Sequence, residues 1–346
     1  MKKHYNIPVF ITHSGCKNDC VFCNQKIITG QAKSAKEMEK KEVRRTIEDF
    51  IKIINRIDNT ANSPVDTEIA FFGGSFTGLD EPEMIEFLEI ANDYIDKYSF
   101  ISGIRLSTRP DYISEEIIEI LLKYRVKSIE LGIQSMFGEV LAACGRGHIV
   151  RDTERACELI KSAGINLTGQ MMLALPESDR AKDIETAKRL VKLGINSARI
   201  YPTIVLQSTQ LYTMYMSGKY TPVSLDEAVF RAKEIKKIFD LDSIEILRMG
   251  LCSSDNINMN ECIGPYHPAF GELVESEIVY DSIVKELQNI NIIKNDEIII
   301  ETDKTNMSKV IGHGKKNILR LREKFHANIR IIENNSFFES YNIIIK

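Results

Sequence analysis

Short β-rich segments alternate with longer helical segments along most of this 346-residue chain. This alternation predicts βα units around a parallel sheet, because each crossover helix covers the strands that flank it. The predicted strands are Pro8–Thr12, Glu68–Phe72, Ser102–Ser107, Ser128–Ile133, Asn166–Leu173, Ser197–Tyr201 and Ser243–Leu247. The predicted helices are Ala35–Ile57, Glu83–Lys97, Glu115–Lys123, Arg151–Ala163, Lys182–Leu193 and Leu225–Phe239. The pattern is compatible with an open sheet or with a barrel.

Three cysteines with C-x3-C-x2-C spacing follow the first predicted strand: Cys16, Cys20 and Cys23. Three thiolates on one tight loop can ligate three irons of a [4Fe–4S] cluster and leave the fourth iron without a protein ligand. The alternative is a structural Cys3His zinc site that includes His13. A single short loop rarely supplies all four tetrahedral ligands, so the spacing favours the cluster.

The composition, 43% hydrophobic and 27% charged residues, is ordinary for a soluble protein. No run reaches the roughly 18–20 apolar residues of a membrane helix, and no signal-peptide core precedes the first strand. The remaining cysteines are scattered and suggest no disulfide framework: Cys144, Cys157, Cys252 and Cys262. We therefore expect a cytoplasmic, reduced protein without a membrane partner.

Polar residues and glycines follow several predicted strands. Gly73, Gly74 and Ser75 come after the second strand, where paired glycines allow a ligand to approach the backbone, although a plain βα turn needs them too. Ser107 and Arg109 end the third strand and suit a ribose or a carboxylate. The alternative for that segment is a turn in which Asp111 caps the next helix.

The next strands add amide side chains and a basic loop. Gln134 and Ser135 end the fourth strand, and Gln170 lies in the otherwise apolar fifth strand, where it is either a site residue or a satisfied core group. Between the fourth strand and the next helix, Cys144–His148 is either a basic loop that grips phosphate or carboxylate or an exposed turn.

In this order, the motifs resemble the radical SAM domain of the Elongator catalytic-subunit family, which modifies the wobble uridine of tRNA. The resemblance covers roughly residues 5–250 and rests on Phe72–Thr77, Ser107–Asp111, Glu130–Ser135, Arg146–His148, Tyr201–Thr203, Leu211–Tyr212 and Gly218–Tyr220. It implies a partial or complete (β/α) barrel with its chemistry at the carboxyl ends of the strands. Two departures are the x3 gap between Cys16 and Cys20, wider in that family, and the short sequence after Tyr280, which leaves no room for its acetyltransferase domain.

The resemblance implies that Cys16, Cys20 and Cys23 hold the cluster. It implies that S-adenosylmethionine (SAM) is bound by Phe22, Gly73, Gly74, Ser75, Ser107, Arg109, Gln134 and Gln170. An electron from flavodoxin or ferredoxin would then cleave SAM to a 5′-deoxyadenosyl radical, which would modify RNA, most plausibly tRNA. One alternative is a small metabolite or tetrapyrrole substrate, as in coproporphyrinogen-oxidase-like relatives, and another is a non-enzymatic, zinc-stabilised RNA-binding protein.

The segment Leu251–Glu277 contains Cys252, Cys262 and His267, which are candidates for a second metal site or ordinary residues of a closing loop. Ile278–Tyr280, which follows, reads as strand-like. We predict a barrel domain over residues 1–285 and a small α+β domain over residues 290–346.

The small domain is predicted to contain strands at Glu297–Glu301, Asn328–Ile332 and Tyr341–Ile345 and helices at Thr305–Ile311 and Lys316–Phe325. This order, with a glycine loop between the helices, resembles the KH module, whose G-x-x-G loop clamps the nucleic-acid backbone. Lys315 stands where the second glycine would be. The segment from Asp303 to Arg330 contains eight Lys or Arg residues and two Asp or Glu residues, whereas the net charge of the whole chain is −4.

The basic segment predicts contact with RNA, with no DNA partner expected. The residues assigned to that contact are Gly312, His313, Gly314, Lys315, Lys316 and Arg320. The alternative is a small cap whose lysines only keep it soluble.

Overall fold

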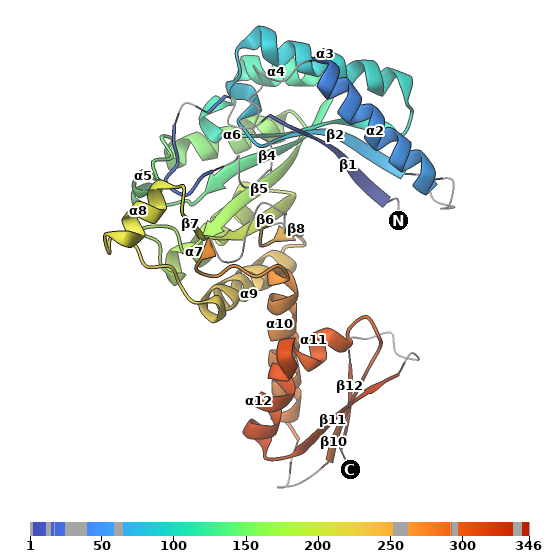
Figure 1. Cartoon of the computed structure of the whole chain (residues 1–346), viewed down its shortest axis with the longest axis vertical. Coiled ribbons are helices and arrows are strands. Elements are labelled where there is room, and N and C mark those ends of the chain that lie inside the picture. Colours follow the sequence, from blue (N-terminus) through green and yellow to red (C-terminus); the bar gives the residue numbers. More distant parts are fainter. Residues whose placement is uncertain are drawn as a thin grey trace.

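The computed structural model describes residues 3–11, 15–16, 18–24, 40–58, 65–251, 262–290, 292, 297–334 and 341–345. Its main sheet has the strand order β1-β2-β3-β4-β5-β6-β8, and all neighbouring strands are parallel. The strands are β1 (Lys3–Phe10), β2 (Val65–Phe72), β3 (Ile101–Thr108), β4 (Val126–Gln134), β5 (Asn166–Leu173), β6 (Ser197–Pro202) and β8 (Glu245–Met249). The sheet curls into a half-barrel (Figure 1), so the predicted barrel is confirmed in its partial form.

Helices cover the outer, convex face of the sheet (Figure 1). They are α2 (Lys40–Asp58), α3 (Glu81–Lys97), α4 (Glu115–Lys123), α6 (Val150–Ser162), α7 (Arg180–Leu193) and α9 (Leu225–Leu241). Alternate residues of the strands, such as Phe71, Leu131 and Ile200, are fully buried beneath them. The opposite residues of each strand therefore lie on the inner face of the curl, where several are polar.

Sequence reasoning missed several short insertions after the strands. Helix α5 (Gly138–Ala143) follows β4, so Cys144–His148 lies after a helix rather than directly after the strand. Helix α8 (Gln210–Met216) follows β6, and the short strands β7 (Val205–Leu206) and β9 (Cys262–Ile263) pair antiparallel. Strand β1 also begins earlier than predicted, because its polar residues pair with β2 from Lys3 onward.

One long helix, α10 (Phe270–Leu287), links the half-barrel to the C-terminal part (Figure 1). The strand-like assignment of Ile278–Tyr280 is therefore wrong: these β-branched and aromatic residues lie inside a helix, where tertiary packing overrides propensity. Phe270 and Val274 pack in the barrel core, whereas Ile283 and Leu287 pack in a second core. A single helix thus belongs to both hydrophobic cores.

The C-terminal part runs β10 (Glu297–Thr302), α11 (Met307–Ile311), α12 (Lys316–Phe325), β11 (Asn328–Glu333) and β12 (Asn342–Ile345). Its sheet has the order β11-β10-β12, with β11 parallel and β12 antiparallel to β10. A short 3-10 turn, His313–Lys315, joins the two helices. The predicted elements are all present, and the glycine loop lies between the helices as expected.

Candidate functional site

The cysteine loop follows β1 at the carboxyl end of the sheet. Cys16, Cys20 and Cys23 form no disulfide and are partly exposed, and the Cys23 amide donates to the Cys20 carbonyl at 2.9 Å to form a turn. The backbone of Val21 anchors the loop on both sides: its amide donates to the Cys144 carbonyl (3.1 Å), and its carbonyl accepts from the Leu211 amide (2.7 Å). Phe22 is partly buried and packs against a small apolar cluster that includes Val21, Cys144 and Leu211.

The cysteine loop lies against the glycine loop that follows β2. The Cys16 Sγ is 3.4 Å from the Ser75 Oγ. Gly15 has a φ of 72°, and a Cβ added there would lie 2.0 Å from the Ser75 carbonyl oxygen, so only glycine fits. Gly73 also has a positive φ, 92°. Two motifs about 60 residues apart in sequence are therefore packed together at the mouth of the half-barrel.

Arg109, predicted to face SAM, is buried and largely committed to protein partners. Its Nε and Nη2 donate to the two oxygens of Asp111, both at 2.9 Å, and Nη2 also donates to the Arg146 carbonyl. Its Nη1 is buried without a partner in the described structure. Asp111 does not cap α4; the Ser114 hydroxyl does so by accepting from the Ile117 amide. Arg109 thus orders the loop around Arg146.

Arg146, which belongs to the Arg146–His148 motif but is not among the predicted site residues, points at Cys20 in the structure. Its Nη1 donates to the Cys20 Sγ at 3.2 Å, and its side chain is buried. The exposed-turn alternative for Cys144–His148 is therefore wrong for this buried arginine, and the grip on phosphate or carboxylate stays a prediction. The adjacent Gly147 packs so closely that a Cβ there would meet the Asn18 side chain at 2.2 Å.

His148 is buried beside these arginines, and neither of its ring nitrogens has a hydrogen-bond partner among the described residues. Burial, reinforced by the charge of Arg146, lowers the pKa of His148 to about 3. The ring is therefore neutral at physiological pH.

The amide and hydroxyl candidates occupy the ends and inner face of the strands. Gln134, at the end of β4, has a φ of 68° and a buried Oε1 without a partner in the described structure. A strained non-glycine residue with an unsatisfied acceptor suggests a functional constraint. Ser107 and Gln170 are partly exposed on β3 and β5. Ser135 is buried, and its hydroxyl accepts from the Phe137 amide.

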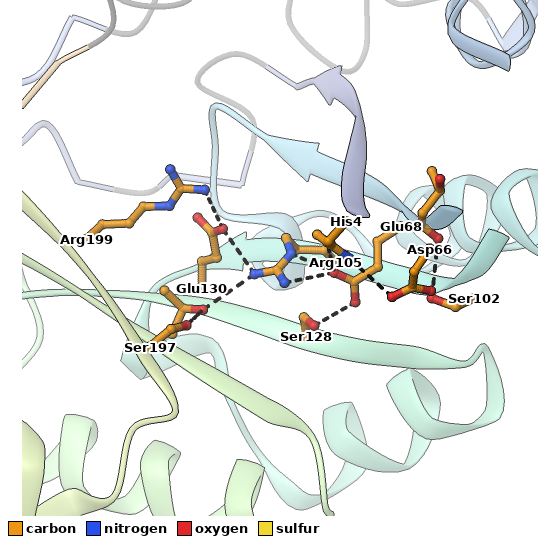
Figure 2. Close-up of polar contacts among 11 residues, drawn as sticks. His4, Asp66, Glu68, Ser102, Arg105, Ser128, Glu130, Ser197 and Arg199 are labelled. Atoms are coloured by element: carbon orange, nitrogen blue, oxygen red, sulfur yellow. Dashed lines mark hydrogen bonds and ion pairs between the residues drawn. The ribbon is translucent and has the colours of Figure 1, made fainter. Parts of the chain in front are cut away.

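A chain of charged residues crosses the inner face below these groups (Figure 2). Arg105 bonds Glu68 at 2.8 Å and Glu130 at 3.4 Å, and Glu130 in turn pairs with Arg199 at 2.8 Å. Burial opposes the charge of Glu68, but hydrogen bonds from His4 and the charge of Arg105 outweigh it and lower its pKa to about 2. The network links β1, β2, β3, β4 and β6, and its individual residues were not singled out from the sequence.

The second metal site has no support in the described residues. No three His, Cys, Asp or Glu side chains of that part of the chain gather around a single ion. Cys252 and His13 lie outside the described residues. His267 instead contacts the ring of His313, with centroids 5.1 Å apart.

The C-terminal loop has the backbone of a tight turn. Gly312, Gly314 and Lys315 all have positive φ, and a Cβ on Gly312 would lie 2.8 Å from the Asn317 Cγ. Two of the predicted RNA contacts already have intramolecular partners. Lys316 pairs with Asp226 at 2.7 Å on the exposed surface, and Arg320 pairs with Glu277 and stacks on the Tyr280 ring at 3.7 Å.

Comparison with known proteins identifies the family. A model of the radical SAM superfamily matches residues 10–191, and a model of the radical SAM C-terminal domain matches residues 195–280. The chain belongs to the radical SAM superfamily. It is an enzyme whose cofactors are a [4Fe–4S] cluster and SAM, which favours the cluster over the zinc alternative. The three thiols on one loop and the unpaired buried acceptor of Gln134 fit that pair of cofactors.

The Elongator-like resemblance is also confirmed. A tRNA uridine(34) acetyltransferase of Methanocaldococcus jannaschii is 35% identical over 127 residues, which are 36% of this chain and 24% of the relative. An uncharacterized protein of the same organism is 31% identical over 236 residues, 65% of this chain and 68% of the relative. The solved structure of Methanocaldococcus infernus Elp3 shares the fold, with a TM-score of 0.61 and 21% identity over 83% of this chain and 64% of that one.

The match to the acetyltransferase thus spans about a quarter of that relative's length.

Among the described residues, no helix has the length and apolar character needed to cross a membrane.

Proposed function

We propose that this radical SAM enzyme modifies RNA, with tRNA as its substrate, in the cytoplasm. The observation that carries the chemistry is the 3.4 Å contact between Cys16 and Ser75, which unites the cysteine loop with the glycine loop. The RNA substrate is supported by similarity to a tRNA uridine(34) acetyltransferase and by the basic C-terminal loop.

In this proposal Cys16, Cys20 and Cys23 ligate the cluster, and the backbone of Gly73 and Gly74, with Ser75, receives the amino acid end of SAM. Ser107, Gln134 and Gln170 present hydroxyl and amide groups to the rest of that molecule, and Phe22 packs beneath the loop. Held by these residues and given an electron from flavodoxin or ferredoxin, the cluster and SAM would supply 5′-deoxyadenosyl radical chemistry for removing a hydrogen atom from the substrate.

The role of Arg146 follows from its contact with Cys20. A guanidinium that donates to a cluster thiolate stabilises its negative charge and fixes the rotamer of the cysteine. Arg109 and Asp111 hold Arg146 from behind, through its carbonyl group. We therefore assign Arg109 a positioning role in place of direct contact with SAM.

The C-terminal loop lies on the same side as the mouth of the half-barrel. A Cβ on Gly264 would lie 3.6 Å from the carbonyl of Thr203, just after β6, and three residues further His267 contacts His313. Lys315 is exposed in that loop, and the surface pair between Lys316 and Asp226 is easily exchanged for a phosphate. One RNA could therefore touch the loop and the strand ends together.

The test is anaerobic reconstitution with iron and sulfide, followed by dithionite and SAM, with 5′-deoxyadenosine measured with and without bulk tRNA. We expect tRNA to increase the product. Cys20→Ala should abolish SAM cleavage, whereas Cys157→Ala, a matched change at a buried cysteine of α6, should retain it.

An amount of 5′-deoxyadenosine that does not change when tRNA is added would favour the small-molecule alternative. Cleavage by the Cys20→Ala variant would overturn the ligand assignment, because the cluster would then depend on other residues.

A further inference from the structure

Two arginines face each other on the last two strands of the main sheet. Arg199 on β6 is the register partner of Arg248 on β8. Their neighbours Ala198 and Ile246, which are also register partners, pack against the outer core. Because side chains alternate along a strand, Arg199 and its partner point to the inner face.

A bulge creates this arrangement. The register shifts between Ala198 and Arg199, so that Leu247 is skipped and Arg248 takes its place opposite Arg199. Without the bulge, simple alternation would bring Leu247 to the inner face and turn Arg248 toward the helices. Bulges are common beside active sites, where they redirect a side chain.

The arrangement is unfavourable for the protein alone. Like charges directly opposite on neighbouring strands destabilise a sheet. Arg199 has one carboxylate partner, Glu130 at 2.8 Å, and its Nε is buried without a partner in the described structure. Arg248 donates its Nε to the Gly250 carbonyl at 3.0 Å, and no carboxylate of the described residues forms an ion pair with it. A bound anion would remove this imbalance.

Arg199 also lies beside the proposed SAM site, and both arginines are partly exposed. The Arg199 guanidinium is 5.9 Å from the ring of Phe72, the residue that precedes Gly73. Tyr201, on the same face of β6, lies within the electrostatic reach of both guanidinium groups and of Glu130. Figure 2 shows Arg199 at the end of the charged network, joined to it only through Glu130.

We propose that Arg199, Arg248 and Tyr201 bind an oxyanion of the substrate, a phosphate or a carboxylate, on the inner face next to the Gly73–Ser75 loop. Two guanidinium forks and a phenol supply the charge-assisted donors that such a group requires. This inference rests on the proposed function, because it places the substrate beside the SAM site.

The test compares wild type with Arg248→Met, which keeps the length of the side chain and removes its charge. The probes are inorganic phosphate, acetate and bulk tRNA, titrated calorimetrically into the reconstituted enzyme in the presence of SAM. Loss of one charge-assisted contact should weaken binding of the matching probe by about tenfold or more. Arg248→Lys should recover part of the affinity, and Arg155→Met, on the outer surface, should not change it.

Weaker binding of phosphate and tRNA would support the site and identify an RNA phosphate as its ligand. Weaker binding of acetate alone would support it with a small carboxylate. Equal affinities of wild type and Arg248→Met for all three probes, or no binding by wild type, would overturn the inference.

Two further measurements separate anion binding by Arg248 from a role in holding the fold together. Without a probe, Arg248→Met should melt at or above the temperature of wild type, since a like-charge contact is removed. A lower melting temperature would mean that the arginine serves the fold instead. Wild type that cleaves SAM but binds none of the probes would contradict the oxyanion site while leaving the radical SAM chemistry intact.

Discussion

At the scale of single residues, a glycine decides how closely the cysteine loop approaches the glycine loop that follows β2. Gly15 touches the backbone of Ser75 and Gly78, so any side chain there would push the two loops apart. The contact depends on the absence of a Cβ as much as on the thiols, because the loops meet through their backbones.

Gly15→Ala should therefore lower both thermal stability and the iron bound per chain after reconstitution. Gly164→Ala is the matched control: its φ of 70° resembles the 72° of Gly15, but nothing lies within 4 Å of an added Cβ. The control should lose only the left-handed backbone cost of about 1–2 kcal/mol and keep its iron. Full iron loading in Gly15→Ala would show that the loops can separate without harm.

The lowered pKa of His148 predicts that the stability of the fold depends on pH. Its pKa in the folded protein, about 3, lies below its ordinary value of 6.5. Below pH 6.5 the unfolded chain therefore binds a proton that the folded protein does not, and stability falls as pH falls. Between pH 6.5 and pH 5 the loss should be about 2 kcal/mol.

Denaturant unfolding of wild type and His148→Leu at several pH values measures this contribution. The variant should show a shallower decline between pH 6.5 and pH 5, whatever its stability at neutral pH. Parallel curves would mean that the pKa of His148 does not change on folding.

At the scale of secondary structure elements, ion pairs connect neighbouring strands on the inner face of the half-barrel, whereas apolar packing connects strands and helices on the outer face. Arg105 on β3 connects Glu68 on β2 to Glu130 on β4, and all three side chains are nearly buried. Removing one partner from a buried ion pair leaves an uncompensated charge.

Arg105→Met should therefore destabilise the fold by about 3–5 kcal/mol, measured by chemical denaturation. Combining it with Glu68→Gln should cost less than the sum of the two single changes, because the stranded charge disappears with its partner. Additive effects would indicate that the contacts are independent.

At the scale of the whole molecule, helix α10 contributes to the barrel core at its start and to the core of the C-terminal part at its end. Phe270 begins that helix beside Gly250, where a Cβ would lie 2.7 Å from the Phe270 Cβ. Asn317, at the start of α12, donates to the Ser276 carbonyl and hydroxyl on α10 and to the Lys309 carbonyl on α11. These contacts hold the basic loop in a defined place relative to the strand ends.

The proposed RNA contact predicts a salt dependence. Lys315→Ala combined with Lys316→Ala should weaken tRNA binding and reduce the slope of log affinity against log salt by about 1.4, since each single-strand phosphate contact contributes about 0.7. Lys236→Ala and Lys237→Ala on α9, whose partners are acidic, serve as controls and should keep the slope. An unchanged slope in the loop variant would place RNA elsewhere.

The sequence alone indicated the class of fold and the presence of an iron–sulfur cluster, because hydrophobic periodicity and cysteine spacing are local properties of a chain, and the assignment of Cys16, Cys20 and Cys23 as its ligands stays a prediction. Helix α12 and strand β5 have their predicted bounds, since their apolar patterns agree with their packing. The strand prediction for Ile278–Tyr280 was wrong because a short apolar run does not distinguish a strand from a buried helix turn.

Only the tertiary structure decided what lies beside what. It directed Arg146 at Cys20, withdrew Arg109 and Arg320 into internal pairs, and brought Arg248 opposite Arg199 through a bulge. Contacts of this kind depend on strand register and on the curl of the sheet, and a shift of one residue reverses the face on which a side chain lies. Their identity is set by packing between distant segments, and no local pattern in the chain records it.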